Sequence, residues 1–147
     1  MAIGGFKQYD ASQVDIVISG ILINSGFASG EFLTIKQSAP DYKKYVGSDG
    51  EVARSRTNDR SGELEIKLAQ TSSGNSFLTA LSNLDILSKN GAGVGAMLIR
   101  DKVSGTCIYT AGKVWIAKPP DVTYDADVTT RTWLLEFADL TRVDAGS

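Results

Sequence analysis

The chain has 147 residues, 42% of them hydrophobic and 22% charged, which suits one folded domain and excludes intrinsic disorder. Its net charge of −2 gives no sign of a basic surface that would hold nucleic acid by its phosphates. It has no histidine and a single cysteine, Cys107, which excludes Ser-His-Asp and Cys-His catalysis, an ordinary zinc site and an intrachain disulfide.

The first segment, about residues 1–12, is expected to be an N-terminal arm. It lacks the basic start and long apolar stretch of a secretory signal. No apolar run in the chain approaches the roughly 18 residues that a membrane helix needs. We therefore expect a soluble protein that is made in the cytoplasm and is not inserted in a membrane.

Most of the remaining chain alternates apolar and polar residues, which is the period of a strand with one buried face. In the clearest case, Leu64, Ile66 and Leu68 alternate with Glu63, Glu65 and Lys67. The pattern predicts strands over 14–23 (interrupted at 20), 33–36, 63–69, 97–100, 107–118 and 131–140.

One segment has the spacing of a helix. Between a serine pair and an Asn-Gly pair, apolar residues recur at intervals of three or four positions, which favours a helix over about 73–89. Ser72 or Ser73 can cap its start, and Asn90-Gly91 can end it. The apolar residues expected to pack on a sheet are Phe77, Leu78, Leu81, Leu84 and Leu87.

The stretch 41–67 is charge-dense, with six acids and six bases in 27 residues. Glycines at 47, 50 and 62 interrupt it. The segment from about residue 38 to 62 is predicted to form a long hairpin or extended loop carrying both signs of charge. The whole chain, 1–147, is expected to be one domain of mainly β class, a sandwich or barrel with one flanking helix.

No motif points to catalysis, a cofactor or a metal. The glycine-rich run 91–95 follows a predicted helix and precedes a strand, the reverse of a phosphate-binding loop. Asp121, Asp125 and Asp127 lack the spacing and the glycine of a calcium loop. We predict no catalytic, cofactor-binding or metal-binding residues, and a role other than that of an enzyme.

Several stretches, taken in order along the chain, are similar to a known family. They are Tyr9-Asp10, 14–20, 47–55 (GSDGEVARS), 58–62 (NDRSG), 63–68, Gln70-Thr71-Ser72 with Asn75, and 115–121 (WIAKPPD). Together they resemble the tail tube proteins of contractile-tailed bacteriophages, which are related to tailocin and type VI secretion tubes. The resemblance spans nearly the whole chain.

The resemblance implies a structural virion protein whose strands join across subunits into a hexameric ring. Stacked rings would form the hollow inner tube of the tail, assembled in the host cytoplasm. Its partners would be further copies of itself and the tail sheath, baseplate and tail terminator proteins. DNA would pass through the lumen into the host during ejection, without specific binding.

Two sets of charged residues are the candidates for these surfaces. Balanced charges suit the contact between subunits or rings, and the arginines can make forked bonds to carboxylates. The alternative is a solvated surface loop with local ion pairs. A non-basic lumen would not grip DNA, since six copies at −2 amount to about −12 per ring. The predicted interface residues are Asp49, Glu51, Arg54, Arg56, Asp59 and Arg60, and the possible lumen-facing residues are Glu63, Glu65 and Lys67.

Two other functions compete with this interpretation. One is another tail component, either a terminator or a baseplate subunit. The other is a β-sandwich module that binds carbohydrate, for which Trp115 or Trp133 could supply a stacking platform. Trp115 and Trp133 both fit alternating strands, however, so we expect them in the core or in an interface.

Overall fold

The structure is a computed structural model that describes residues 14–88, 90–91, 93–101 and 107–144. The N-terminal arm predicted for residues 1–12 lies outside these described residues. Within these described residues there are ten strands and one helix. They are β1 (Val14–Ile18), β2 (Ile21–Ile23), β3 (Leu33–Gln37), β4 (Tyr42–Val46), β5 (Val52–Arg56), β6 (Gly62–Ala69), α1 (Gly74–Leu87), β7 (Gly95–Asp101), β8 (Cys107–Lys118), β9 (Thr130–Phe137) and β10 (Leu140–Asp144).

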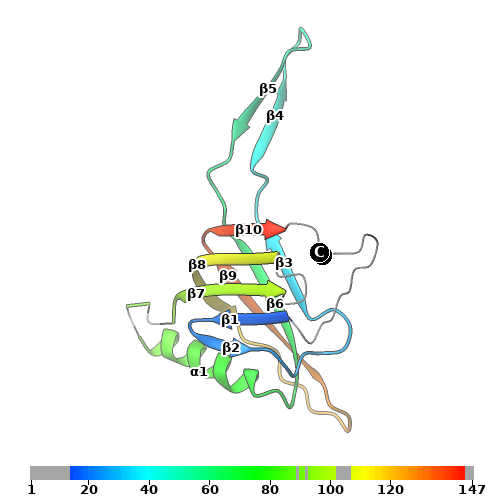
Figure 1. Cartoon of the computed structure of the whole chain (residues 1–147), viewed down its shortest axis with the longest axis vertical. Helices are drawn as coiled ribbons and strands as arrows, with labels where there is room; N and C mark the ends of the chain where they lie inside the picture. The colour runs from blue at the N-terminus through cyan, green and yellow to red at the C-terminus, as the bar shows by residue number, and fades with distance from the viewer. Residues whose placement is uncertain (1–13, 89, 92, 102–106, 145–147) are drawn as a thin grey trace, which may run out of the picture.

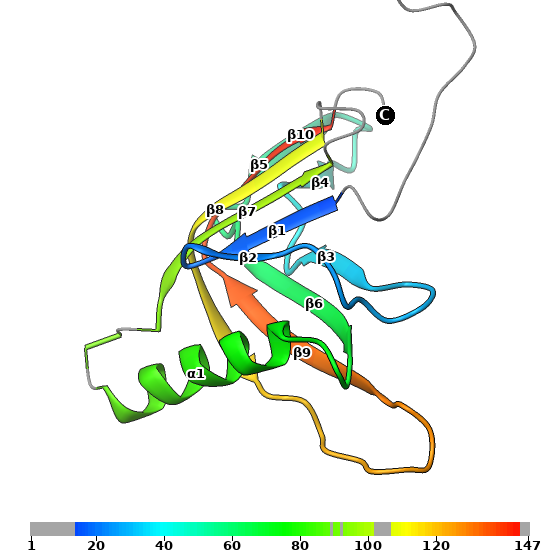
Figure 2. The same cartoon turned by 60° about the horizontal axis from the view of Figure 1, so that its bottom comes forward.

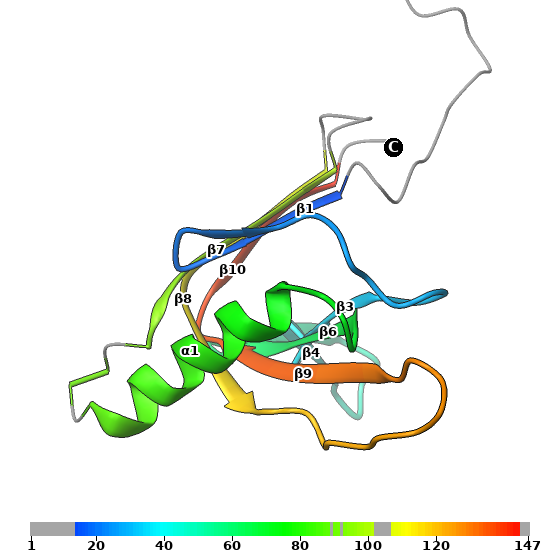
Figure 3. The same cartoon turned by 90° about the horizontal axis from the view of Figure 1, so that it is seen from below.

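Eight strands form one antiparallel sheet in the order β2-β1-β7-β8-β9-β6-β3, and β10 pairs with β8 beside β9. The long strand β8 passes from one layer to the other, so the sheet folds back on itself (Figures 2 and 3). One layer holds β1, β2, β7 and β10, and the other holds β3, β6 and β9. The sheet does not close into a barrel, and α1 lies beside its open side. The predicted mainly β fold with one flanking helix is confirmed.

The core lies between the two layers. Alternate residues of β6 and β9 face it, and Leu64, Ile66, Leu68, Leu135 and Phe137 are completely buried. The alternation predicted for both strands is therefore confirmed. Trp133 is only 2% exposed and shares this face, which is why it cannot serve as a platform for a sugar.

One prediction for the last strand was wrong. Residues 131–140 were expected to form a single strand, but β9 ends at Phe137 and β10 begins at Leu140. β9 pairs with the second half of β8, and β10 pairs with the first half. The break at Ala138 and Asp139 carries no glycine or proline that could have signalled it in the sequence.

The helix covers the sheet with only part of its predicted apolar face. Leu78 and Leu81 are buried, whereas Phe77, Leu84 and Leu87 are 44%, 51% and 84% exposed. The C-terminal end of α1 extends past the sheet (Figure 3), so Leu84 and Leu87 do not reach the core that the described residues form. Burial of the whole apolar face was therefore predicted wrongly.

The start of α1 is fastened to the sheet by polar contacts. The Ser72 hydroxyl accepts a hydrogen bond from the Gly74 amide at 3.2 Å, while Ser73 makes no side-chain cap. The Asn75 side chain accepts a bond from the Trp133 indole at 2.9 Å and donates one to the Ala69 carbonyl at 2.9 Å. This pairing satisfies the indole N–H, which would otherwise be buried without a partner.

Candidate functional site

The most prominent feature is a β-hairpin, β4–β5, that projects away from the body of the molecule (Figure 1). The hairpin predicted within 38–62 is therefore present. All ten of its strand residues are exposed, including Tyr45 at 69% and Val52 at 63%. A two-stranded hairpin with no core beneath it is marginally stable in water. Its exposed apolar side chains therefore suggest a surface that is covered in use.

The register of the hairpin sorts its charges by face. Tyr42 lies opposite Arg56, Lys44 opposite Arg54, and Val46 opposite Val52, so these six side chains share one face, here called the basic face. The Arg54 guanidinium lies over the Tyr42 ring, 4.1 Å from its centroid.

The opposite face of the hairpin carries Lys43, Tyr45, Ala53 and Ser55. The two faces therefore differ in charge. On the basic face, Lys44 and Arg54 are like charges placed directly across the ladder, which destabilises an isolated hairpin.

The remaining predicted interface residues lie at the tip and base of the hairpin. Asp49 and Glu51 are in the turn, where the Asp49 carboxylate accepts a hydrogen bond from the Glu51 amide at 3.0 Å. Asp59 lies at the base, where the hydroxyl and amide of Ser61 donate to its carboxylate at 2.5 and 3.0 Å. Those two bonds, the hydroxyl first, lower the pKa of Asp59 below its usual value.

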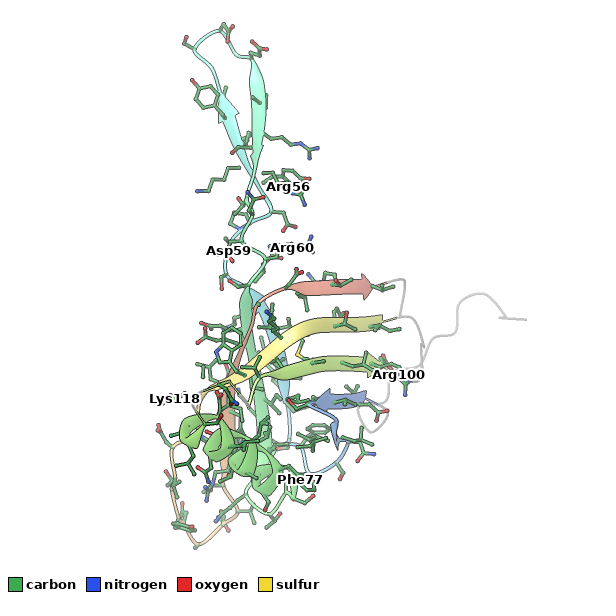
Figure 4. The ribbon with its side chains drawn as sticks, turned by 90° about the vertical axis from the view of Figure 1, so that its left-hand side faces the viewer. Arg56, Asp59, Arg60, Phe77, Arg100 and Lys118 are labelled. Carbon is green, nitrogen blue, oxygen red and sulfur yellow. The ribbon has the colours of Figure 1, made fainter. Side chains whose placement is uncertain are left out.

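Arg60 makes its contacts within the chain. Its guanidinium donates to the Leu140 carbonyl at 2.9 Å and lies 3.5 Å from the Asp139 carboxylate. Figure 4 places Arg60 at the base of the hairpin, near Asp59 and below Arg56. Arg60 therefore fastens the hairpin base to the junction between β9 and β10.

The three predicted lumen residues share the outer face of β6, opposite the buried leucines. Lys67 lies 3.9 Å from Glu65. The strand register shows a further residue on this face that could not be predicted from the sequence. Glu136 of β9 lies directly opposite Glu63. Two acids side by side repel each other, but Lys36 of β3 lies opposite Glu63 on its other side. On the outer face of β3, β6 and β9, acids therefore outnumber bases by only three to two: Glu63, Glu65 and Glu136 against Lys36 and Lys67.

A loop at the other end of the molecule, residues 119–129, joins β8 to β9 (Figure 1). Every residue from 121 to 128 is exposed, including Val122 at 60% and Tyr124 at 78%. The end of the loop is held by Gln70, whose side-chain oxygen accepts hydrogen bonds from the Thr129 amide and hydroxyl at 3.2 and 3.0 Å. A groove of about 400 Å³ lies between the loop and the outer face of β6 and β9.

Catalytic chemistry has little support in this arrangement. Over residues 14–88, 90–91, 93–101 and 107–144, no group of three acidic, histidine or cysteine side chains is placed to hold a metal. No described helix is both long enough and apolar enough to cross a membrane. The distinctive features are exposed surfaces, not an enclosed polar site.

Comparison with known proteins identifies the family. Residues 2–144 match the family described as the bacteriophage PhiTE tail tube protein. The chain belongs to this tail tube family. It is also 29% identical to structural protein ORF10 of Pseudomonas phage KPP10 over 149 residues, an alignment that covers 98% of this chain and 86% of that protein. The resemblance expected from the sequence is therefore confirmed, and the protein is a structural component of a phage tail.

Solved structures with a similar fold come from contractile injection systems. The tube-terminating cap of the anti-feeding prophage has a TM-score of 0.62 at 10% identity, covering 99% of this tail tube chain and 97% of the cap. The sheath/tube terminator of the PVC extracellular contractile injection system has a TM-score of 0.59 at 11% identity, covering 95% and 99%. A chain of the PVC sheath-tube complex has a TM-score of 0.59 at 10% identity, covering 92% and 90%. At these identities the likeness concerns the fold.

Proposed function

We propose that this protein is the tube subunit of a contractile phage tail, in which hexameric rings stack into a hollow conduit for DNA. The observation that carries the proposal is the projecting hairpin, whose ten exposed strand residues have no core of their own. Membership of a tail tube family supports it. The sheath, baseplate and tail terminator would be the partners of the tube in the virion tail, which is assembled in the host cytoplasm.

Lateral contact within a ring would use the open edges of the folded sheet. Within the described residues, β2 pairs only with β1, β3 only with β6, and β10 only with β8. Each of these strands leaves backbone donors and acceptors that a neighbouring subunit can satisfy. Closing a ring of such subunits removes the free edges, as barrel closure does.

The exposed end of α1 would add apolar area to the same lateral contact. Ile86 is 74% exposed and Leu87 is 84% exposed. Val94, in the connection between α1 and β7, is 39% exposed. Large apolar side chains grouped at a surface are typical of protein interfaces. A neighbouring subunit would cover this helix end in the assembled ring.

Contact between rings would use the hairpin. Asp49, Glu51, Arg54 and Arg56 lie on it, and Asp59 and Arg60 lie at its base, where Arg60 sets the direction in which it projects. Charged contacts of this kind fix the register of two surfaces more than they add affinity. The hairpin would gain most of its order when a neighbour covers it.

The lumen would be lined by the outer face of β6 and β9. Glu63 and Glu136 face each other there, with Glu65 one pair further along. Because acids outnumber bases by three to two on this wall, with Lys36 beside Glu63 and Lys67 beside Glu65, it does not attract phosphate, and DNA would slide past without being held. The tube would act as a passive conduit.

A second candidate function is that of a tail terminator, a ring that ends the tube. The fold is as similar to a tube-terminating cap and a sheath/tube terminator as to a chain of a sheath-tube complex, with TM-scores of 0.62, 0.59 and 0.59. A terminator would form single rings that do not stack on one another.

Sedimentation and negative-stain electron microscopy of the purified protein separate these functions. A tube subunit forms hollow tubes whose length grows with protein concentration. A terminator forms rings of fixed size at every concentration. A protein that stays monomeric at high concentration would contradict both.

A further inference from the structure

The hairpin needs an acceptor surface on the next copy, and the charges of the molecule indicate where that surface is. This inference rests on the proposed stacking of rings. Lys44, Arg54 and Arg56 make the basic face cationic, and Val46 and Val52 complete that face near the tip. Within the part of the chain that the structure describes, Lys44 and Arg56 lie within ion-pair distance of no carboxylate. The acceptor should therefore offer exposed carboxylates together with apolar side chains.

The 119–129 loop has both properties. Asp121, Asp125 and Asp127 are exposed and alternate with exposed Val122 and Tyr124, and no base lies among residues 119–129. Lys118 lies 3.8 Å from Asp121 and so offsets that acid. Among the described residues, Asp125 and Asp127 have no cation within ion-pair distance.

The positions of the two surfaces suit head-to-tail contact. The hairpin tip and the 119–129 loop lie at opposite ends of the long axis of the molecule (Figure 1). Figure 4 shows Arg56 on the projecting hairpin and Lys118, which precedes the loop, in the lower body of the molecule. A contact between two different surfaces repeats from copy to copy and generates a filament when the rotation between copies does not close a ring.

We propose that the basic face of the hairpin of one copy docks on the acidic 119–129 loop of a second copy in the next ring. Lys44, Arg54 and Arg56 then face Asp125 and Asp127, and the valines of the tip contact Val122 and Tyr124. The acceptor is held in place before docking, because Gln70 bonds to Thr129 and the Thr129 hydroxyl donates to the Thr123 carbonyl at 3.0 Å. Docking offsets the repulsion between Lys44 and Arg54, because it places carboxylates beside both cations.

Charge reversal tests the pairing. Lys44→Glu should raise the protein concentration at which tubes form by about tenfold or more, since like charges brought together at an interface cost several kcal/mol. Lys43→Glu is the matched control: it makes the same change at the neighbouring residue on the opposite hairpin face. It should assemble as the wild type does.

A compensating variant decides whether the 119–129 loop is the acceptor. Arg54→Glu with Arg56→Glu, and separately Asp125→Lys with Asp127→Lys, should each block tubes while leaving the circular dichroism spectrum unchanged. All four substitutions together should restore tubes, because the reversed surfaces attract again. An equimolar mixture of the two double variants should also assemble, since each supplies the surface that the other lacks.

The outcomes separate this inference from the proposed function. If the wild type forms tubes but the loop variant also does, or the four-fold variant is not rescued, the acceptor is wrong and the tube function stands. If Lys43→Glu blocks tubes as strongly as Lys44→Glu, the assigned face is wrong. If the wild type forms no tubes, the proposed function fails.

Discussion

Gly62, where the hairpin base enters β6, should tolerate no side chain. A Cβ at this position would lie 2.1 Å from the Lys36 carbonyl oxygen and 2.6 Å from Cζ of Phe137, whereas real Cβ contacts are essentially never below 3.0 Å. Phe137 is completely buried in a close-packed core, and Lys36 belongs to the β3–β6 ladder, so neither can move away freely. Gly62→Ala should therefore force β3 away from β6.

Gly62→Ala should lower the free energy of unfolding by about 3 kcal/mol. This is the upper part of the range for overpacking, because one of the two clashes is with backbone. For a chain of this length, that lowers the melting temperature by about 6–12 °C. Urea unfolding of dispersed protein, followed by circular dichroism, measures it. Gly112→Ala is the control, since that strand glycine has no neighbour within 4 Å of the added Cβ and should change the free energy of unfolding by less than about 0.5 kcal/mol. Equal stability of the two variants would refute the reasoning.

Three further predictions concern the helix anchor, the helix end and the lumen wall. Asn75→Ala should lower the free energy of unfolding by about 2 kcal/mol in urea titrations, because the buried Trp133 indole N–H loses its acceptor; an unchanged midpoint would contradict this. Ile86→Asn should leave that free energy within about 0.5 kcal/mol but reduce the fraction of protein that sediments as tubes, and unaltered tube yield would rule out the helix end as a contact. Glu63→Lys should give tubes that retain short DNA at low salt and release it at high salt. Wild-type tubes should not retain the DNA, and equal retention by wild-type and variant tubes would remove β6 from the lumen.

The period of the side chains was enough to predict most of the fold. Alternation located β6 and β9 with their buried faces, and helical spacing located α1 to within two residues of each end. Alternation says nothing about which strands become neighbours, so the split between β9 and β10 was missed. Helical spacing likewise cannot tell whether a sheet continues beneath the helix, which is why Leu84 and Leu87 were wrongly expected in the core.

The candidate surfaces were predicted less completely, because they depend on register. The sequence pointed to the charged hairpin, but only the pairing of β4 with β5 separates Lys43 from Lys44. Glu136 was missed for the same reason, since its position opposite Glu63 follows from the β6–β9 register. The aspartates of the 119–129 loop lack the spacing of a calcium site, so the sequence predicted only a solvated loop there. Its place opposite the hairpin requires the fold.

The proposed tube requires neighbouring copies to complete the open sheet edges of this subunit. Cryo-electron microscopy of the assembled protein, at a resolution that separates strands, would show whether they do. We expect a hollow tube in which edge strands of adjacent subunits hydrogen-bond into one continuous sheet around the lumen. Subunits that touch only through side chains, with their edge strands left open to solvent, would contradict it.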